Sequence, residues 1–442
     1  MKVAFISMSG VRVRTAELAA LGVSLPGFVE RGEVIASLPS LAGLQLAALT
    51  PKDVEFVYID VADIETHTLE VGYDLVAFST FTAMAYECYE LAAKYRDAGV
   101  TVVIGGLHAT LMPLEAMEHF DSVCVGDGEL IWPRMIQDYR DGDLKSIYRA
   151  SDEPLYDINE APIPRFDLLD LDKYNRLTVQ TSRGCPLDCS FCASSKIYGK
   201  FRQKSVENVL AEIDAICAIW PNPFIELADD NTFINKKWSK EFLRGMAQRD
   251  VRWFTETDIA IADDPELLDL LAASGCQQVL VGFESTNPES LMGIDRNDWK
   301  LRQLNSYKAA IQRIQSRGVT VNGCFIIGLE DDTVETFDEI RDFVVDSELL
   351  ECQITVLTPF PNTKLYRQFE SEGRLLKLDY WDRCTLFDVT YTPAKMSVAE
   401  LERGLRRLFV EIYSEDATNR RRRLYMEIHK GRIEAGLVGN HS

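Results

Sequence analysis

Short apolar runs alternate with longer amphipathic stretches over the N-terminal third of the chain. Runs of residues typical of β-strands stand at 2–6, 55–59, 75–79, 101–104 and 122–125, and apolar residues recur at helical spacing in 83–98 and 128–139. Regular alternation of strands and helices predicts a parallel sheet with helices on both faces. We therefore expect an α/β, Rossmann-like domain at residues 1–149.

A second alternation follows a segment at 150–173 that is rich in proline and acidic residues and predicts a linker. Strands are expected at 177–181, 224–228, 252–257, 278–284, 319–327 and 353–357, and helices at 206–219, 237–249, 265–273, 302–317 and 334–346. Six such units predict a partial (β/α)6 barrel of the TIM type at 174–378, with its site at the carboxyl ends of the strands. Residues 379–442 predict a short helical tail whose apolar face, at 398–409, is able to cover the barrel mouth.

Composition narrows the possible partners. The chain has 442 residues and a formal net charge of −22, which argues against a nucleic acid or an anionic membrane as partner. No apolar stretch reaches the roughly 18 residues that would span a bilayer, and no basic and apolar leader opens the sequence, so a cytoplasmic protein is expected. The basic run Arg420–Arg423 is expected to be a solvated helix face.

Three cysteines spaced C-x3-C-x2-C follow the first strand of the predicted barrel. A four-iron four-sulfur cluster normally takes four cysteines, so a cluster on Cys185, Cys189 and Cys192 leaves one iron open to another ligand. A zinc site would require a second close pair, and no second C-x2-C is present. A disulfide would require an oxidising compartment. The other seven cysteines are scattered and are expected to be small buried hydrophobes.

With Phe191 directly before the last cysteine, this loop resembles the signature of the radical S-adenosylmethionine (SAM) superfamily. The resemblance implies that the amino and carboxylate groups of SAM chelate the open iron and that the cluster passes one electron to the sulfonium. An external electron donor such as flavodoxin or ferredoxin is implied as a partner.

The ends of the predicted barrel strands carry the residues expected to hold SAM. Asp229 and Asp230 match the superfamily's amino-group motif, with Asp229 the stronger candidate. An N-cap for the following helix is the competing explanation, and one residue can serve both purposes. The acid that ends the fourth strand resembles one that contacts the methionine or ribose part of SAM. The partner of the SAM carboxylate stays open, since Glu256-Thr257-Asp258 stands where related sequences often have arginine. Gly328 ends a segment similar to G-x-I-x-G, and Thr358 opens a T-P-x-P-x-T turn that a purely structural role also explains. The full expected set is Phe191, Asp229, Asp230, Glu256, Glu284, Gly328 and Thr358.

Three turns of the N-terminal domain resemble those of the cobalamin-binding domain found in front of many radical SAM enzymes. They contain Ser79 and Thr80, then Gly105 and Gly106, and then Gly126, and the resemblance implies that they accommodate the nucleotide tail of cobalamin. The D-x-H-x-x-G motif that supplies a cobalt ligand is absent: its place reads Ser7-Met8-Ser9-Gly10-Val11-Arg12, and none of His67, His108, His119, His429 and His441 lies in such a motif. Cobalamin without histidine ligation is therefore expected. A Rossmann-like domain that has lost its ligand is the alternative.

Together these resemblances imply a cobalamin-dependent radical SAM enzyme, best interpreted as a methyltransferase that acts on an unactivated carbon or a phosphinate phosphorus of a small molecule or natural product. In the implied reaction a 5′-deoxyadenosyl radical abstracts a substrate hydrogen, and methylcobalamin supplies the methyl group. A rearrangement, cyclisation or ring contraction without methyl transfer is the first alternative. A non-catalytic cobalamin or iron–sulfur sensor is the second, although no helix-turn-helix with a basic face accompanies it. The substrate, the catalytic acids and bases and the oligomeric state are left open.

Overall fold

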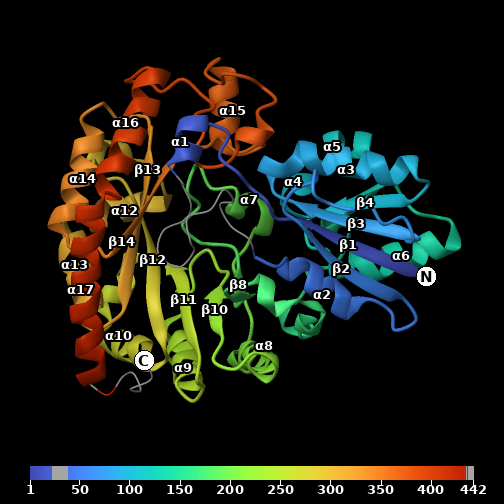
Figure 1. The fold of residues 1–442 in the computed structure, drawn as a ribbon, viewed down its shortest axis with the longest axis horizontal. Helices are drawn as coiled ribbons and strands as arrows, with labels where there is room; N and C mark the ends of the chain where they lie inside the picture. Colours follow the sequence, from blue (N-terminus) through green and yellow to red (C-terminus); the bar gives the residue numbers. More distant parts are fainter. Residues whose placement is uncertain (22–37, 435, 437–442) are drawn as a thin grey trace.

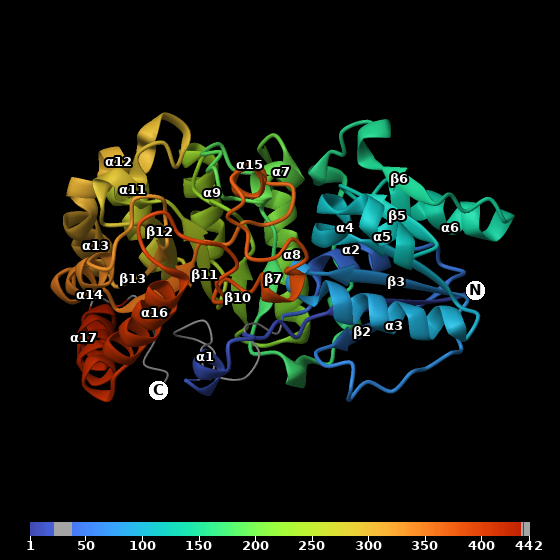
Figure 2. The same cartoon turned by 90° about the horizontal axis from the view of Figure 1, so that it is seen from above.

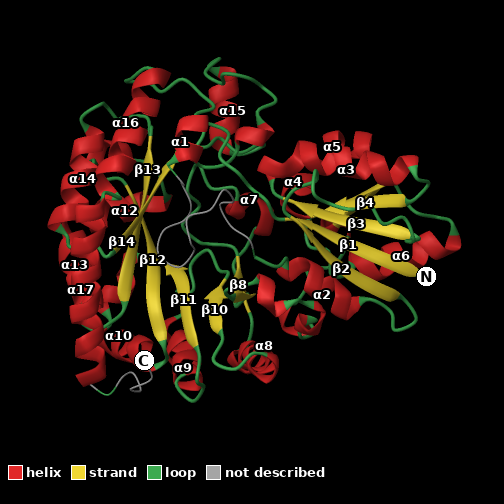
Figure 3. Cartoon of the chain, viewed as in Figure 1, coloured by secondary structure: helices red, strands yellow, loops and turns green. Residues whose placement is uncertain are grey.

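The computed structural model describes residues 1–21, 38–434 and 436 of the chain. Two α/β domains lie side by side, and the carboxyl ends of the N-terminal strands point toward the second domain (Figure 1). Helices flank both sheets (Figure 3). No helix in the described ranges combines the length and the apolar character that crossing a membrane would require.

The N-terminal sheet is wholly parallel and has the order β2-β1-β3-β4-β5-β6. The five predicted strands are confirmed, and a sixth was not predicted because it has only three residues. The strands are β1 (Lys2–Met8), β2 (Glu55–Val61), β3 (Leu75–Thr80), β4 (Thr101–Gly105), β5 (Ser122–Val125) and β6 (Ile147–Arg149). The direction of the strand order reverses between β1 and β3, which is where an open sheet of this kind forms a ligand crevice.

Each face of this sheet is buried by its own set of helices. Helices α3 (Ala85–Asp97), α4 (Gly106–Leu111) and α5 (Pro113–His119) pack on one face, and α2 (Leu41–Leu49) and α6 (Ile131–Asp141) pack on the other. Successive strand residues alternate between the two cores, as the pleat requires. Val76 and Val102, for example, belong to the first core, whereas Ala77 and Val103 belong to the second.

The second domain is an open, wholly parallel sheet of order β14-β13-β12-β11-β10-β7, which confirms the partial barrel. Its strands are β7 (Leu177–Val179), β10 (Phe224–Leu227), β11 (Arg252–Thr257), β12 (Cys276–Glu284), β13 (Thr320–Ile327) and β14 (Glu351–Val356), and its helices are α8 (Val206–Ile219), α9 (Lys236–Met246), α10 (Pro265–Ala273), α11 (Pro288–Leu291), α12 (Trp299–Gln303), α13 (Tyr307–Gln315), α14 (Thr336–Asp346) and α15 (Lys364–Ser371). The single helix expected at 302–317 is broken by a 3₁₀ turn, Leu304–Ser306. The short ribbon β8 (Ser182–Arg183) and β9 (Arg202–Gln203) and helix α7 (Ser194–Tyr198) flank the cysteine loop.

The apolar face expected at 398–409 packs against the barrel, since a Cβ at Gly328, beside the end of β13, would lie 3.1 Å from Leu401. That this face covers the barrel mouth stays a prediction. Helix α16 (Val398–Ile412) packs against α14 on the outer side of the barrel. Only a glycine fits at position 404, because a Cβ there would lie 2.2 Å from the ring of Phe337. Helix α17 (Glu415–Glu434) continues on this side, away from the N-terminal domain (Figure 2). Three of the four arginines of the 420–423 run are exposed there, as expected for a solvated face.

The segment just before α16 connects the two domains. Leu375 and Tyr391 form an antiparallel bridge, and the Tyr391 hydroxyl donates to the Gly328 carbonyl beside the end of β13. Trp381 of the same segment donates its indole N–H to Glu115 of α5, at 2.9 Å. The short helix α1 (Ala16–Ala20) follows a stretch whose Thr15 donates to Asp388 of this segment. The N-terminal domain therefore packs against the tail as well as against the barrel.

Candidate functional site

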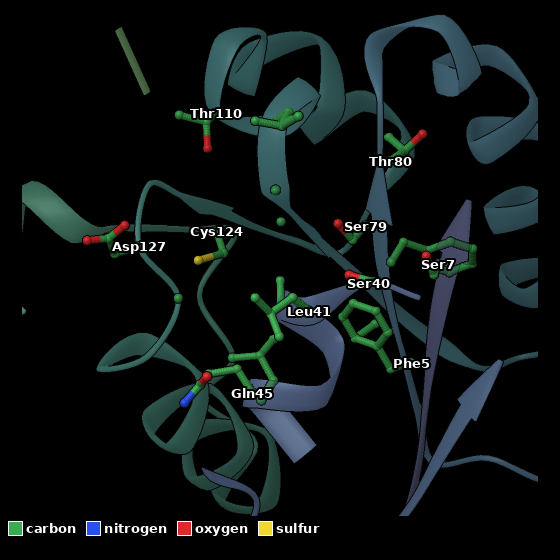
Figure 4. A pocket seen from close by; sticks show the side chains of 18 of the residues that line it. Phe5, Ser7, Ser40, Leu41, Gln45, Ser79, Thr80, Thr110, Cys124 and Asp127 are labelled. Carbon is green, nitrogen blue, oxygen red and sulfur yellow. The ribbon is translucent and has the colours of Figure 1, made fainter. Parts of the chain in front are cut away.

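One cavity of about 420 Å³ lies at the carboxyl ends of the N-terminal strands and reaches the barrel. All five residues expected to bind cobalamin line it: Ser79, Thr80, Gly105, Gly106 and Gly126. Figure 4 shows Ser79 and Thr80 at the end of β3 beside this cavity. The structure thus brings together three turns that are far apart in the sequence.

Two of the glycines are required by the backbone and by the space around them. Gly106 has a φ of 85°, and a Cβ there would lie 2.7 Å from the Oγ of Ser79. Gly126 has a φ of 90°, and a Cβ there would lie 2.9 Å from the Cβ of Ala150. A side chain at either position would be strained and would narrow the cavity. The residues present therefore fit a bulky planar cofactor that approaches the backbone closely.

The cavity contains no histidine among its described lining residues. His108, which follows Gly106 by two residues, is fully buried on the other face of the sheet. Its ring nitrogens lie 2.8 Å from the Tyr89 hydroxyl and 3.4 Å from the Thr82 hydroxyl. These contacts give His108 a structural role. The absence of a histidine cobalt ligand stays a prediction, and His441 lies outside the described residues.

An ion-pair network joins the cavity to the cysteine loop. Arg183, two residues before Cys185, pairs with Asp127 at 3.1 Å and with Glu129, both on the turn after β5. Arg202 pairs with the same Asp127 at 2.7 Å. Arg183, Asp127 and Glu129 are largely buried, so water screens these pairs weakly. This interdomain network fixes the turns expected to bind cobalamin relative to the cysteine loop.

The three expected cluster ligands lie on one loop that faces the barrel interior. All three thiols are half-buried. Within the described residues, no set of three cysteine, histidine or acidic side chains converges as it would around a single metal ion. Burial raises the pKa of Cys185 to about 11 and also raises the pKa of Cys189, so cluster binding would displace protons from both thiols.

Asp229 supports the cysteine loop. One carboxylate oxygen accepts hydrogen bonds from the backbone N–H groups of Thr181 and Ser182, both at 2.8 Å, and the other accepts from the hydroxyls of Thr181 and Thr232 at 2.6 and 3.1 Å. The residue is 3% exposed. Its acceptor capacity is therefore used within the protein. The roles of Asp229 and of its neighbour Asp230 toward SAM stay predictions.

Asp230 and Glu256 lie at the wall of the barrel interior. Both side chains are accessible to solvent there, although many protein atoms surround them. Burial among those atoms, together with the nearby carboxylates of Glu226 and Asp230, raises the pKa of Glu256 to about 8. Burial likewise raises the pKa of Asp230. Among the described residues, neither carboxylate forms an ion pair with a lysine or an arginine. Asp230 is hydrogen-bonded to the backbone of Gly184, which lowers its pKa against the effect of burial. A cationic or hydrogen-bond-donating ligand can use its remaining acceptor sites and those of Glu256.

Glu284 is paired with a residue that the sequence analysis did not identify. Lys300 donates to Glu284 at 2.9 Å and to the carbonyl of Gly282 at 2.5 Å, and both side chains are nearly buried. Glu284 has a φ of 63°, a conformation rare for a residue with a side chain. The adjacent segment holds the cysteine loop, since Ser190 donates its N–H to the carbonyl of Ile294 at 2.9 Å. Lys300 is therefore a cation close to the cluster loop, and no motif marks it in the sequence.

Gly328 and Thr358 are committed to turns. The Gly328 N–H donates to Asp332 at 2.9 Å, and the hydroxyl of Thr358 donates to the carbonyl of Val356 at 3.0 Å. Phe191 is half-buried against the barrel core. The roles of these three residues toward SAM stay predictions.

Comparison with known proteins agrees with this arrangement. Residues 36–135 match the B12 binding domain, residues 179–344 match the radical SAM superfamily, and residues 363–436 match a domain of unknown function, DUF4070. Over 385 residues the chain is 29% identical to a bacteriochlorophyllide d C-12(1)-methyltransferase of Chlorobaculum tepidum. This alignment covers 86% of this chain and 83% of that protein.

Two further proteins place this similarity in context. A hopanoid C-2 methylase of Rhodopseudomonas palustris is 24% identical over 360 residues, which are 78% of this chain and 67% of the methylase. The solved structure of TsrM, a radical SAM methyltransferase from Kitasatospora setae with cobalamin and a [4Fe-4S] cluster bound, superposes with a TM-score of 0.68 at 15% identity and covers 97% of this chain and 99% of TsrM. The TsrM likeness shows a shared fold.

Proposed function

Because the chain belongs to the radical SAM superfamily and carries a B12 binding domain in front of its radical SAM domain, we propose that it is a cobalamin-dependent methyltransferase that methylates an unreactive carbon, or a phosphinate phosphorus, of a small molecule. The observation that carries this proposal is the continuity of the cobalamin cavity with the barrel, since its lining includes Gln180, Arg183 and Ala228. A methyl donor and a radical generator have to reach the same substrate atom.

The residues of the chain have distinct roles in this proposal. Cys185, Cys189 and Cys192 would hold the cluster, and Asp230 would bind the amino group of SAM through a charge-assisted hydrogen bond. When bound, the cluster and cobalamin would supply the electron and the methyl group. The protein orients these groups and excludes water. A flavodoxin- or ferredoxin-like protein is proposed as the electron donor.

The lining of the cobalamin cavity gives the turns their proposed roles. Ser79 and Thr80 would border the nucleotide tail of the cofactor, and Gly105, Gly106 and Gly126 would let it approach the backbone. Glu256 would accept a hydrogen bond from the ligand in the barrel, or donate one in its protonated form.

The proposal is tested by the origin of the methyl group. The protein, with its cluster reconstituted and hydroxocobalamin bound, is incubated under reducing conditions with SAM that carries a trideuteromethyl group. Mass spectrometry should detect this group on the protein-bound cobalamin, even without the unidentified substrate. The matched controls are hydroxocobalamin without protein and the variant Cys185→Ala/Cys189→Ala/Cys192→Ala, which should lose its iron and form no 5′-deoxyadenosine.

The alternatives predict other products. An anaerobic magnesium-protoporphyrin IX monomethyl ester cyclase of Rubrivivax gelatinosus is 25% identical to the chain. The alignment covers 71% of this chain and 61% of the cyclase. A radical reaction without methyl transfer would release 5′-deoxyadenosine but leave the cobalamin without deuterium. A sensor would give neither product. Either result would contradict the proposed methyl transfer.

A further inference from the structure

The inner end of the cobalamin cavity is a slot inside the N-terminal domain. One wall is the face of the sheet, and the other is formed by helices α2 and α6. The side chains that line this slot are apolar: Phe5, Ala77 and Val103 from the sheet, Leu41 and Leu46 from α2, and Trp132 and Met135 from α6. Figure 4 shows Phe5 and Leu41 directed into this space.

Two polar side chains of the slot donate their N–H groups to other parts of the protein. The indole N–H of Trp132 donates to the hydroxyl of Thr50 at 2.9 Å, and the side-chain amide of Gln45 donates to the carbonyl of Pro162 at 2.7 Å. The hydroxyl of Ser79, at the entrance, makes no hydrogen bond to another described residue. A ligand in the inner slot therefore meets carbon atoms and few free donors or acceptors.

We propose that this slot selects the base of the cobamide nucleotide and prefers a 5,6-dimethylbenzimidazole base to adenine. This inference rests on the proposed function, because it assumes that the nucleotide tail enters the cavity. A planar base fits between a sheet and two helices, and the apolar walls favour the two methyl groups of dimethylbenzimidazole.

Adenine is the disfavoured base because of its exocyclic amino group and its additional ring nitrogens. In water these groups are hydrogen-bonded, whereas in the slot most of them would be left without partners. A buried polar group without a partner weakens binding by roughly ten- to hundredfold. The ring nitrogen that both bases share can accept from Ser79, so it does not discriminate between them.

The test compares three corrinoids on the wild-type protein. Equilibrium dialysis with detection by absorbance measures the dissociation constants of hydroxocobalamin, of its counterpart with an adenine base, and of cobinamide, which lacks the nucleotide. Hydroxocobalamin should bind roughly ten- to hundredfold more tightly than the adenine counterpart. Equal affinity for the two bases, or equal affinity for cobinamide, would overturn the inference while leaving cobalamin binding intact. No binding of any corrinoid would overturn the proposed function and this inference with it.

A pair of matched variants locates the preference. Ala77→Ser adds one hydroxyl to the slot wall on β3, and Ala92→Ser adds the same group to a buried position of α3 on the opposite face of the sheet. The first change should reduce the preference for hydroxocobalamin severalfold by giving adenine a partner, and the second should leave the ratio of the two affinities unchanged. Thermal unfolding of both variants separates an effect on the slot from a loss of fold. An unchanged ratio in a folded Ala77→Ser protein would contradict the assignment of the slot.

Discussion

The two halves of the candidate site, in the N-terminal domain and in the barrel, differ in how well the type of a residue predicts its role. In the N-terminal domain, the small residues at the strand ends all line one cavity. In the barrel, four acids at equivalent strand ends have different surroundings: Asp229 holds a loop, Glu284 is paired with Lys300, and Asp230 and Glu256 face open space. A glycine acts through the space it leaves, which the local backbone sets. A carboxylate acts through partners that come from distant segments.

The first prediction challenges the N-terminal half of this comparison. Gly106→Val should abolish cobalamin binding, or weaken it at least about a hundredfold, because its side chain would enter the cavity beside Ser79. Equilibrium dialysis with hydroxocobalamin measures this loss. Gly99→Ala is the control, since Gly99 has a similar φ of 80° but nothing within 4 Å. It should share the backbone strain and still bind cobalamin. Equal losses in both variants would show that strain, not space, matters at Gly106.

The second prediction compares two adjacent acids. Asp230→Ala should weaken SAM binding roughly ten- to hundredfold, because a charge-assisted hydrogen bond is worth about 1.5–3 kcal/mol. Asp229→Ala should lower the free energy of unfolding by at least about 3 kcal/mol, because buried N–H groups of Thr181 and Ser182 lose their acceptor. SAM titration and denaturant unfolding on both variants measure these effects. Weaker SAM binding by a stable Asp229→Ala protein, with Asp230→Ala unaffected, would restore the order expected from the sequence.

The third prediction concerns the charged pair near the cluster. Lys300 and Glu284 both act electrostatically on Cys189. Lys300→Met should make the midpoint potential of the cluster more negative, by about 59 mV for a tenfold change in a one-electron equilibrium, because a reduced cluster loses a stabilising cation. Glu284→Gln should shift it in the opposite direction. Redox titration followed by electron paramagnetic resonance measures both shifts. Shifts of the same sign would exclude an electrostatic cause.

The smallest expected effect is the pH dependence of Glu256. Its pKa is raised to about 8, above that of an unfolded glutamate, so the folded protein retains a proton that the unfolded chain has lost. The stability of the cofactor-free protein should therefore fall as the pH rises from about 4.5 to about 8. Glu256→Gln should flatten this slope and equal the wild type below about pH 4.5. Denaturant unfolding at several pH values measures the difference, and parallel profiles would contradict the assigned environment.

The sequence predicted the architecture well because hydrophobic periodicity reflects local geometry. The helices at 206–219 and 265–273 and the strand at 252–257 have the predicted bounds. Strand β6 was missed because three residues carry no periodicity. The packing partner of α16 was not predictable, since its apolar face fits any apolar surface and only the tertiary structure selects Phe337 of α14.

The candidate site was predictable where a motif sets the geometry. The cysteine spacing and the glycine turns are local patterns, and the structure places each set on one loop or around one cavity. The partners of the acids were not predictable. Lys300 reaches Glu284 only because of the fold, and Asp229 bonds to residues 47 and 48 positions earlier in the chain. Such contacts are long-range, and a single sequence carries no record of them.

The interdomain network around Arg183 limits how such enzymes can be recombined. A chimaera that received its B12 binding domain from a relative lacking acids equivalent to Asp127 and Glu129 would bury the guanidinium of Arg183 without a counter-charge. Breaking a buried pair in this way costs about 3–5 kcal/mol, a large part of the stability of an ordinary domain. The two acids and the arginine two residues before the first cysteine of the loop therefore have to be exchanged together, although they belong to different domains.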